Sequence, residues 1–547
     1  MKELKKNVLI LPVDINVKPY QLFYFLFSSN KYSNFIFLDS SLIPNKYSKY
    51  SYIALNPDFV IKGFKDFNEI EIYKNFNKSI EDYLLLNNCY ILNNSNIAFN
   101  NSSKYKPIKK IIRSNLHPLK FLKLIFNMFL NNNENGNFNK TYKINFNKDS
   151  FSFLKDMNPD FIGGFVGYFS YDLKNYIEKL PQTAVDDVGV PLYYFMYFSD
   201  ILAYNHSLDR WLNISISDNT FNIFDKSNND FGNFIIRENQ FNLDGTALDC
   251  NIEKQIVNRY KTKKIKNIEL KSNFSKKDYI NAVLKAKEYI HNGDIYQVNL
   301  TQRFFCETEI KPYDLYYILR KKNPAPFSAY ISFPEFTICS SSPERFIFIK
   351  NNNIHTRPIK GTRPRGSDSL QDKKFINELK NSIKDRAELN MIVDLERNDL
   401  GKFCQYGTVK VVEHAVIEKY AKVFHSVSTI EGKILEGYDI VDIIKSVFPG
   451  GSITGAPKIR AMEIIDELEP NTRGVYTGSI GYIGIDGTVD LNIAIRTFVI
   501  KDKKFYYNVG GGIVEDSIPY DEYQETLDKG LALKETLNYF LYENVSL

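Results

Sequence analysis

Two regular patterns of apolar and polar residues alternate over the second half of the chain. Residues 275–294 (SKKDYINAVLKAKEYIHNGD) place apolar side chains at helical spacing, which predicts an amphipathic helix with Ser275 as its N-cap and Gly293 near its end. Residues 296–306 (YQVNLTQRFFC) instead alternate between the two classes, as a strand does. Together, the two stretches predict a helix followed by a strand.

The same alternation continues toward the C-terminus. Residues 387–402 predict a helix that ends at Gly401, and residues 520–541 predict an amphipathic helix. Between them, residues 490–514 predict two antiparallel strands joined at the polar sequence DKK. Helices that alternate with antiparallel strands indicate an α+β fold, built as a layered sandwich of sheets and helices.

The first half of the chain differs in composition. It is rich in Asn, Lys, Phe, Ile and Tyr, whereas glycines punctuate the sequence densely after residue 270. We therefore divide the chain into an N-terminal region, 1–260, and a second domain, 270–541. The polar stretch 131–150 (NNNENGNFNKTYKINFNKDS) predicts a low-complexity insertion near 130–150.

Composition narrows the class of protein. Of 547 residues, 44% are hydrophobic and 24% are charged, as in an ordinary globular protein. A net charge of +6 spread over this length gives no concentrated basic stripe, so we expect no binding of nucleic acid. The five cysteines have no CxxC spacing, and no apolar run has the ~20 residues of a membrane span. We expect a soluble, cytoplasmic protein.

Residues 356–366 (TRPIKGTRPRG) hold the densest group of cations, namely Arg357, Lys360, Arg363 and Arg365. Two prolines and two glycines argue against a helix or a central strand. The segment is typical of an anion-binding loop, and the arginines next to Lys360 could also lower its pKa by repulsion between like charges.

Two pairs of acidic residues are spaced for one helix face. Asp385 and Glu388 form one pair, and Glu522 and Glu525 form the other. Four such carboxylates could hold Mg²⁺, which prefers a few carboxylates together with water and an anionic ligand. From spacing alone, a solvated helix surface is the favoured explanation of these pairs.

Glycine clusters and isolated polar residues complete the candidate chemistry. Residues 450–458 (GGSITGAPK) precede a predicted helix, and residues 509–514 (VGGGIV) end a predicted strand, so both could bring backbone N–H groups to an anion or form ordinary tight turns. The isolated polar candidates are Glu344, His425, Tyr476 and Arg496.

Taken together, these segments resemble the chorismate-utilising enzymes. The resemblance covers residues ~275–541, through blocks such as GDIYQVNLTQRF, SSPERF, RPIKGTRPRG, ELNMIVDLERNDLGK, FPGGSITGAPKIRAME and YDEYQETLDKG. Residues 37–57 and 163–181 look like the N-terminal motifs of that family. The resemblance implies antiparallel sheets packed face to face with flanking helices, chorismate as substrate and Mg²⁺ as cofactor.

The resemblance also implies roles for named residues. Lys360, Glu344 and His425 are the candidate catalytic residues, as nucleophile, proton donor and ring-orienting group. The candidate substrate-binding residues are Gln297, Ser452, Tyr476, Arg496, Gly510 and Gly512. The candidate Mg²⁺ ligands are Glu388 and Glu525, assisted by Asp385 and Glu522.

Two positions separate the activities within the family. Isochorismate and salicylate synthases activate water with a lysine where this chain has Gln297, and an amide cannot act as a base. Anthranilate synthases typically carry PIAGT, whereas aminodeoxychorismate synthases carry PIKGT, as here at Lys360. The resemblance therefore favours formation of 4-amino-4-deoxychorismate for 4-aminobenzoate and folate synthesis, with anthranilate synthesis as the alternative.

The resemblance implies two further binding partners. No cysteine lies in a glycine-rich nucleophile turn, so ammonia is expected from a separate glutamine amidotransferase subunit. Ser40 lies where many family members contact L-tryptophan. Because NPAPF at 323–327 departs from the NPSPY of feedback-inhibited anthranilate synthases, inhibition is not expected, and structural binding of tryptophan stays open.

Overall fold

The computed structural model describes residues 1–547 except for a set of segments, most of which lie in the first half of the chain. The excluded residues are 1–5, 14, 29–33, 43–46, 48, 74–77, 93–107, 109, 131–141, 147–157, 219–244, 264, 266, 421–422 and 542–547. Most of the predicted insertion at 131–150 therefore lies outside the described residues. Of that stretch, only a short strand at its centre is described.

Two large sheets form the framework, each with 13 strands. The first sheet runs, in spatial order, β13 (Lys271–Ser272), β14 (Gln297–Glu307), β26 (Lys504–Ile513), β25 (Thr497–Lys501), β16 (Thr337–Ser342), β15 (Phe327–Ser332), β2 (Phe35–Asp39), β3 (Tyr50–Leu55), β11 (Asp200–Asn205), β12 (Arg210–Asp218), β1 (Lys6–Val13) and β8 (Tyr142–Phe146), with β22 (Gly455–Ala456) beside β14. Its described pairs are antiparallel apart from β1 with β8.

The second sheet has the same size. Its order is β19 (Ile359–Pro364), β21 (Val423–Lys433), β18 (Asn353–Arg357), β17 (Arg345–Lys350), β24 (Val489–Asn492), β23 (Ser479–Gly484), β9 (Gly164–Phe169), β10 (Tyr193–Phe198), β4 (Phe59–Gly63), β5 (Asn68–Ile72), β7 (Lys110–Ser114) and β6 (Cys89–Ile91), with β20 (Lys410–Lys419) beside β21. Strands from both halves of the sequence thus join in each sheet.

The sheets face each other across one apolar core. Tyr52 of the first sheet packs edge-on against Tyr482 of the second with ring centroids 6.0 Å apart, and Tyr194 of the second sheet packs at a tilt against Phe333, which follows β15, with centroids 4.1 Å apart. A second cluster of buried aromatic residues lies between the first sheet and α1 (Pro19–Ser28) and α8 (Pro312–Lys322). The expected fold, antiparallel sheets packed face to face with flanking helices, is confirmed.

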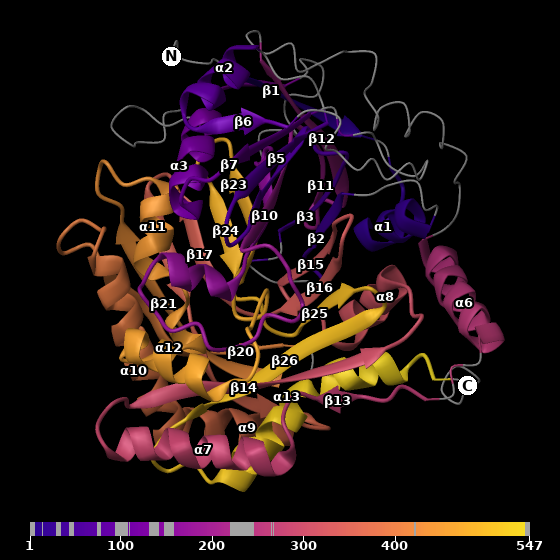
Figure 1. Cartoon of the computed structure of the whole chain (residues 1–547). Helices are drawn as coiled ribbons and strands as arrows, with labels where there is room; N and C mark the ends of the chain where they lie inside the picture. The colour runs from indigo at the N-terminus through magenta and orange to yellow at the C-terminus, as the bar shows by residue number, and fades with distance from the viewer. Residues whose placement is uncertain are drawn as a thin grey trace.

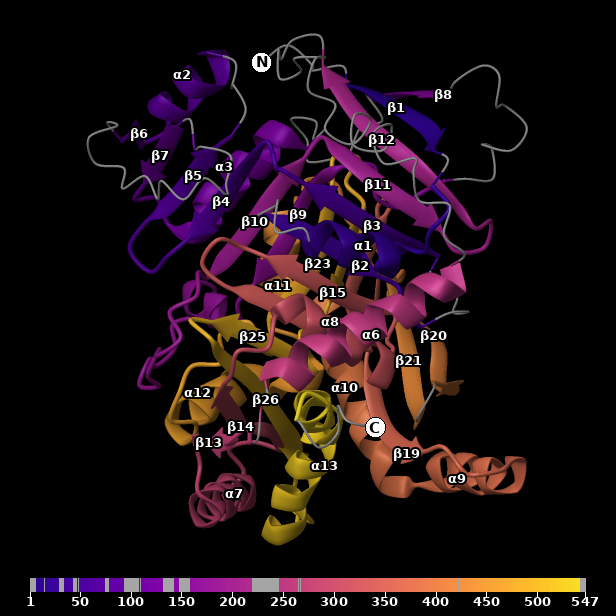
Figure 2. The same ribbon diagram turned by 90° about the vertical axis from the view of Figure 1, so that its right-hand side faces the viewer.

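Helices cover the outside of this framework (Figures 1 and 2). Figure 1 shows α7 (Lys276–His291) and α13 (Pro519–Asn538) beneath the long strands β14 and β26. The other helices are α2 (Lys78–Leu86), α3 (Pro118–Phe129), α6 (Gly245–Lys263), α9 (Ser369–Asn381), α10 (Ile383–Gly401), α11 (Ile440–Val447) and α12 (Lys458–Leu468), with 3₁₀ turns η3 (Tyr171–Tyr176) and η5 (Gly451–Ile453). In the described residues no helix is both long enough and apolar enough to span a membrane.

Local signals predicted several of these elements. Ser275 caps α7 by accepting from the N–H of Asp278, as predicted. The helix expected at 387–402 begins earlier, at Ile383, because Ser382 caps it. The stretch 490–514 holds the end of β24 as well as the β25–β26 hairpin, so the prediction of two strands was incomplete.

The cationic segment 356–366 also deviates in part from its prediction. Thr356 and Arg357 end β18, which lies inside the second sheet. Residues 359–364 then form β19, a strand at the sheet edge, where prolines can be accommodated. The edge position leaves Lys360 beside the helices rather than between two strands.

Candidate active site

Glu344 lies in the turn between β16 and β17 and is 5% exposed. Its carboxylate accepts a hydrogen bond of 2.7 Å from the Ser452 hydroxyl, which η5 brings to this point. Burial raises the pKa of Glu344, against the opposing effects of Ser452 and Lys360. A buried carboxyl with a raised pKa can hold a proton for transfer to a leaving group.

Lys360 on β19 shares this environment. Burial is the main cause that lowers its pKa, and the positive charge of Lys529 lowers it further. Glu388, Glu344 and Glu525 act in the opposite direction, because their negative charges favour the protonated form of Lys360. A lysine with a lowered pKa is neutral more often, which is the form that can attack carbon.

The arginines around Lys360 do not have the role expected from the sequence. Arg357 pairs with Glu418 at 2.9 Å, Arg363 with Asp385 at 2.8 Å, and Arg365 with Asp372 at 2.7 Å. A paired arginine exerts little net repulsion on its neighbours. Burial and Lys529, rather than these arginines, lower the pKa of Lys360.

His425 on β21 is 2% exposed. Its Nδ1 lies 2.9 Å from the Thr362 hydroxyl, and its buried Nε2 has no hydrogen-bond partner among the described residues. Burial, together with the charge of Arg496, lowers the pKa of His425 to about 3. The imidazole is therefore neutral near pH 7 and offers one free nitrogen.

Arg496 completes this side of the cluster. It adopts a φ of 51°, in the left-handed region, and its guanidinium donates to the Asn323 side chain at 3.1 Å. Burial lowers the pKa of Arg496, while the charges of Tyr420 and Glu344 oppose that effect. A buried guanidinium beside a carboxyl is suited to holding the carboxylate of a small ligand.

The glycine-rich end of β26 pairs with β14, the strand that begins at Gln297. A Cβ at Gly512 would stand 2.4 Å from Gln297 Nε2, so a larger residue there would collide with that amide. Gln297 is 1% exposed and its Oε1 has no partner among the described residues. Gly510 gives its carbonyl to Lys529 at 2.9 Å. Free amide groups and close backbone approach suit a polar ligand.

Tyr476 lies in the connection between α12 and β23. It is 6% exposed, and burial raises the pKa of its hydroxyl. The positive charge of Arg473 opposes this effect on the pKa. Arg473 also donates to the carbonyl of Ile453, the residue after Ser452. The structure thus links Tyr476 to the Glu344 cluster through Arg473.

The four candidate metal ligands come from α10 and α13. The negative charge of Glu525 raises the pKa of Glu388 and that of Glu522. Glu522 and Glu525 are three residues apart on α13. Burial raises the pKa of Glu388 and of Glu522, whereas Lys529 holds the pKa of Glu525 below its ordinary value despite burial. The same lysine pairs with Glu525 at 2.6 Å.

These carboxylates are not arranged as a complete metal site. Within the ranges that the structure describes, no three His, Cys, Asp or Glu side chains are grouped to hold a metal ion, and Asp385 is paired with Arg363. One feature does fit a hard cation. Glu522 Oε2 is buried and has no hydrogen-bond partner in the described part of the chain, and Gly511 provides space beside it, since a Cβ there would lie 3.1 Å from that oxygen. A cation between α10 and α13 would partner this oxygen.

Sequence reasoning missed two contributors to the cluster. Lys529 joins Glu525 to Gly510 and lowers the pKa of Lys360, and Asn323 holds Arg496. Lys529 lies four residues after Glu525, a spacing that predicts a contact on a helix. Asn323 gave no comparable signal, because its partner is 173 residues away.

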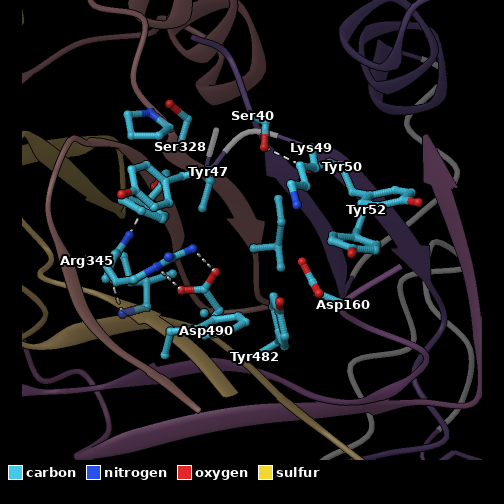
Figure 3. A pocket seen from close by; sticks show the side chains of 18 of the residues that line it. Ser40, Tyr47, Lys49, Tyr50, Tyr52, Asp160, Ser328, Arg345, Tyr482 and Asp490 are labelled. Atoms are coloured by element: carbon cyan, nitrogen blue, oxygen red, sulfur yellow. Dashed lines mark hydrogen bonds and ion pairs between the residues drawn. The ribbon is translucent and has the colours of Figure 1, made fainter. Parts of the chain in front are cut away.

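Ser40 lies elsewhere, at the wall of a cavity of about 420 Å³ between the two sheets (Figure 3). Its hydroxyl donates to the Tyr50 carbonyl at 2.7 Å. Across the cavity, Arg345 and Asp490 form a bidentate pair with distances of 2.9 and 2.8 Å. Neither Lys360 nor the other candidate catalytic residues line this cavity, so it is separate from the Glu344–Lys360 cluster.

The comparison with known families decides the class of the protein. The sequence model of the chorismate binding enzymes matches residues 106–535, which is most of the chain. The chain belongs to the chorismate binding enzyme family. In this chorismate binding enzyme, the match takes in both the Glu344–Lys360 cluster and part of the N-terminal half.

Individual relatives point to two activities. The enzyme is 40% identical over 380 residues to aminodeoxychorismate synthase component 1 of Bacillus subtilis, covering 69% of this chain and 78% of that one. It is also 40% identical over 387 residues to anthranilate synthase component 1 of Acetivibrio thermocellus, covering 69% and 75%.

Solved structures agree with the fold. Anthranilate synthase component I from Streptococcus pneumoniae superposes with a TM-score of 0.65 at 27% identity, over 90% of this chain and 93% of that one. The isochorismate synthase MenF of Escherichia coli superposes with a TM-score of 0.62 at 14% identity, over 98% and 95%. The second match bears on the fold alone.

Proposed function

We propose that this chorismate binding enzyme is the large subunit of an aminodeoxychorismate synthase, which converts chorismate and ammonia to 4-amino-4-deoxychorismate. The observation that carries the proposal is Lys360, a lysine with a pKa lowered by burial, placed beside the buried Glu344 carboxyl. Replacement of a hydroxyl group is helped by an acid that protonates the leaving oxygen and by a nucleophile that attacks the ring.

The reaction would use the two residues together. Glu344, protonated because burial raises its pKa, gives its proton to the 4-hydroxyl of chorismate as that group leaves. Neutral Lys360 attacks C2 at the same time and forms a covalent adduct. Ammonia then adds at C4 and expels the lysine, while the enolpyruvyl group stays on the ring.

The other residues would bind and orient chorismate. Arg496, Ser452, Tyr476 and the backbone at Gly510 and Gly512 would hold the enolpyruvyl end, and Gln297 would face the ring. His425, neutral near pH 7, would present its free Nε2 to the substrate. These residues do not form or break covalent bonds in the proposal.

Mg²⁺ belongs to the same proposal. Glu388 and Glu525 would hold the ion, with Asp385 and Glu522 assisting, and the unpartnered Glu522 Oε2 supports this placement. Bound there, the ion would supply positive charge for the ring carboxylate of chorismate. These four carboxylates would stay ionised next to the bound ion, since a cation favours the charged form of a carboxyl group.

Ammonia would come from a separate glutamine amidotransferase subunit. Hydrolysis of glutamine by a cysteine requires an accessible thiolate. The four cysteines whose side chains the structure describes (Cys89, Cys306, Cys339 and Cys404) are buried. Burial raises the pKa of each of these thiols. The name "component 1" that both relatives carry also supports a second subunit.

Product analysis tests the function directly. The purified chain is incubated with chorismate, Mg²⁺ and ammonium, and the products are separated with and without an added aminodeoxychorismate lyase. We expect a non-fluorescent product that the lyase converts to 4-aminobenzoate. Fluorescent anthranilate as the main product would establish the alternative, anthranilate synthase, and refute the proposal.

L-tryptophan is the proposed ligand of the cavity at Ser40. The cavity volume of about 420 Å³ and its mixture of aromatic and charged walls suit an aromatic amino acid. Calorimetric titration with L-tryptophan, with L-phenylalanine in parallel, tests this assignment. Heat that saturates for tryptophan supports it, and no heat with a protein purified free of amino acids refutes it.

A further inference from the structure

Tyr420 directly follows β20, and His425 lies near the start of β21. It is 5% exposed, and its N–H donates to the Val423 carbonyl at 2.8 Å. Its ring packs against the imidazole of His425 with a centroid distance of 4.9 Å and an interplanar angle of 76°. One side of the imidazole is therefore fixed by an aromatic wall.

The cationic segment 356–366 holds Tyr420 from two directions. Arg357 is 4% exposed and donates to Glu418 at 2.9 Å, and Glu418 in turn accepts from the Tyr420 hydroxyl at 3.3 Å. Arg365 donates to the carbonyl of Tyr420 at 3.1 Å. Two arginines of one segment thus anchor the side chain and the backbone of the same residue.

The same segment holds the other side of His425. Thr362, which lies between these two arginines, bonds Nδ1 of the imidazole at 2.9 Å. Nδ1 is thus engaged and the Tyr420 ring lies edge-on to the imidazole, while Nε2 has no hydrogen-bond partner among the described residues. We propose that Tyr420, anchored by Arg357, Glu418 and Arg365, is a positioning residue that fixes the imidazole of His425 for contact with the substrate.

The neutral state of His425 makes its orientation important. A charged group attracts an anion from many directions, whereas a neutral imidazole acts through one directed nitrogen. Rotation of the ring would remove that nitrogen from the substrate without changing any charge. The inference rests on the proposed function, because it takes chorismate as the molecule that meets His425.

Single variants of Tyr420 separate the ring from the hydroxyl. Tyr420→Leu removes the aromatic wall, and we expect kcat to fall about 10- to 100-fold with KM for chorismate changed less than about threefold. Tyr420→Phe keeps the wall and is expected to stay within about threefold of wild type. Tyr406→Leu is the matched control, because Tyr406 is fully exposed.

A double variant tests whether Tyr420 acts through His425. If it does, Tyr420→Leu with His425→Ala consumes chorismate no more slowly than His425→Ala alone. Losses that multiply would overturn the inference, and so would Tyr420→Leu at the wild-type rate or Tyr420→Phe as slow as Tyr420→Leu. Should Tyr420→Leu unfold, Tyr420→Met, which also removes the aromatic ring, replaces it in the cycle, with the same expected loss of about 10- to 100-fold.

The readout keeps this inference apart from the proposed function. Chorismate consumption measures the coupling between the two residues whatever the product is. Product identity in the same reactions tests the assignment as an aminodeoxychorismate synthase. Anthranilate as the product, with losses that do not multiply, would therefore refute the function and support the positioning role.

Discussion

The buried carboxyl of Glu396 makes the stability of this enzyme depend on pH. Glu396 lies on α10, is 8% exposed, and accepts a hydrogen bond of 2.7 Å from Thr356. Burial raises its pKa from an ordinary 4.5 to about 8, and the nearby charges of Glu344 and Asp399 add to the effect. The proposed chemistry does not use this group, so its replacement tests stability rather than mechanism.

The direction of the effect follows from proton binding. Between about pH 4.5 and pH 8 the folded protein keeps a proton on Glu396 that the unfolded chain releases. Stability is therefore complete below the lower value and is lost as pH rises toward the higher one. A pKa difference of 3.5 corresponds to roughly 5 kcal/mol over the whole range, or about 1.4 kcal/mol for each pH unit within it.

Glu396→Gln removes this dependence. From about pH 5.5 to about pH 7.5 the variant should gain roughly 2.7 kcal/mol relative to wild type. For a chain of 547 residues, an unfolding entropy of about 2 cal/mol/K per residue converts this to a relative Tm increase of about 2 °C. The measurement is thermal unfolding of both proteins across a pH series.

The control is an exposed carboxylate. Glu307 has a side chain that is 72% exposed, so Glu307→Gln should keep a constant Tm difference from wild type across the same series. A Tm difference for Glu396→Gln that is equally flat would refute the reasoning, because it would mean that Glu396 ionises in the folded protein as readily as in the unfolded chain.

Three further predictions concern the two sites. Lys360→Ala should abolish formation of 4-amino-4-deoxychorismate, and a wild-type rate would disprove the covalent step. Glu388→Gln should raise the Mg²⁺ concentration for half-maximal activity about tenfold or more, whereas Glu378→Gln, on α9, should leave it unchanged, as titration after removal of metal by chelation would show. Asp490→Asn should destabilise the protein by about 3 kcal/mol, because it leaves the 6%-exposed Arg345 without its carboxylate, and a Tm within 1 °C of wild type would contradict this.

Helices with a capping residue directly before an amphipathic run could be predicted from the sequence. The cap at Ser275 was visible because a serine precedes an amphipathic run. The start of α10 was missed although Ser382 and Asp385 have the spacing of a cap and its third helical residue. A capping signal that lies before the apolar repeat is easily assigned to a loop.

The partners of the arginines could not be predicted from sequence. Arg357 meets Glu418 across 61 residues and Arg363 meets Asp385 across 22. Which carboxylate neutralises which cation depends on how β19, β20 and α10 pack, and composition carries no information on that. The expectation that these arginines repel Lys360 failed for this reason, since a run of like charges says nothing about its counter-charges.

The way the two halves share their sheets bears on synthesis of the protein. β2 pairs with β15, and β9 pairs with β23. Two strands from the first 170 residues therefore pair with strands that are synthesised after residue 326. During translation the early strands emerge long before these neighbours exist. Their open edges are then exposed to other chains, which favours aggregation. We therefore expect residues 1–260, expressed alone, to depend on chaperones, and residues 270–541 supplied separately to restore them to solution.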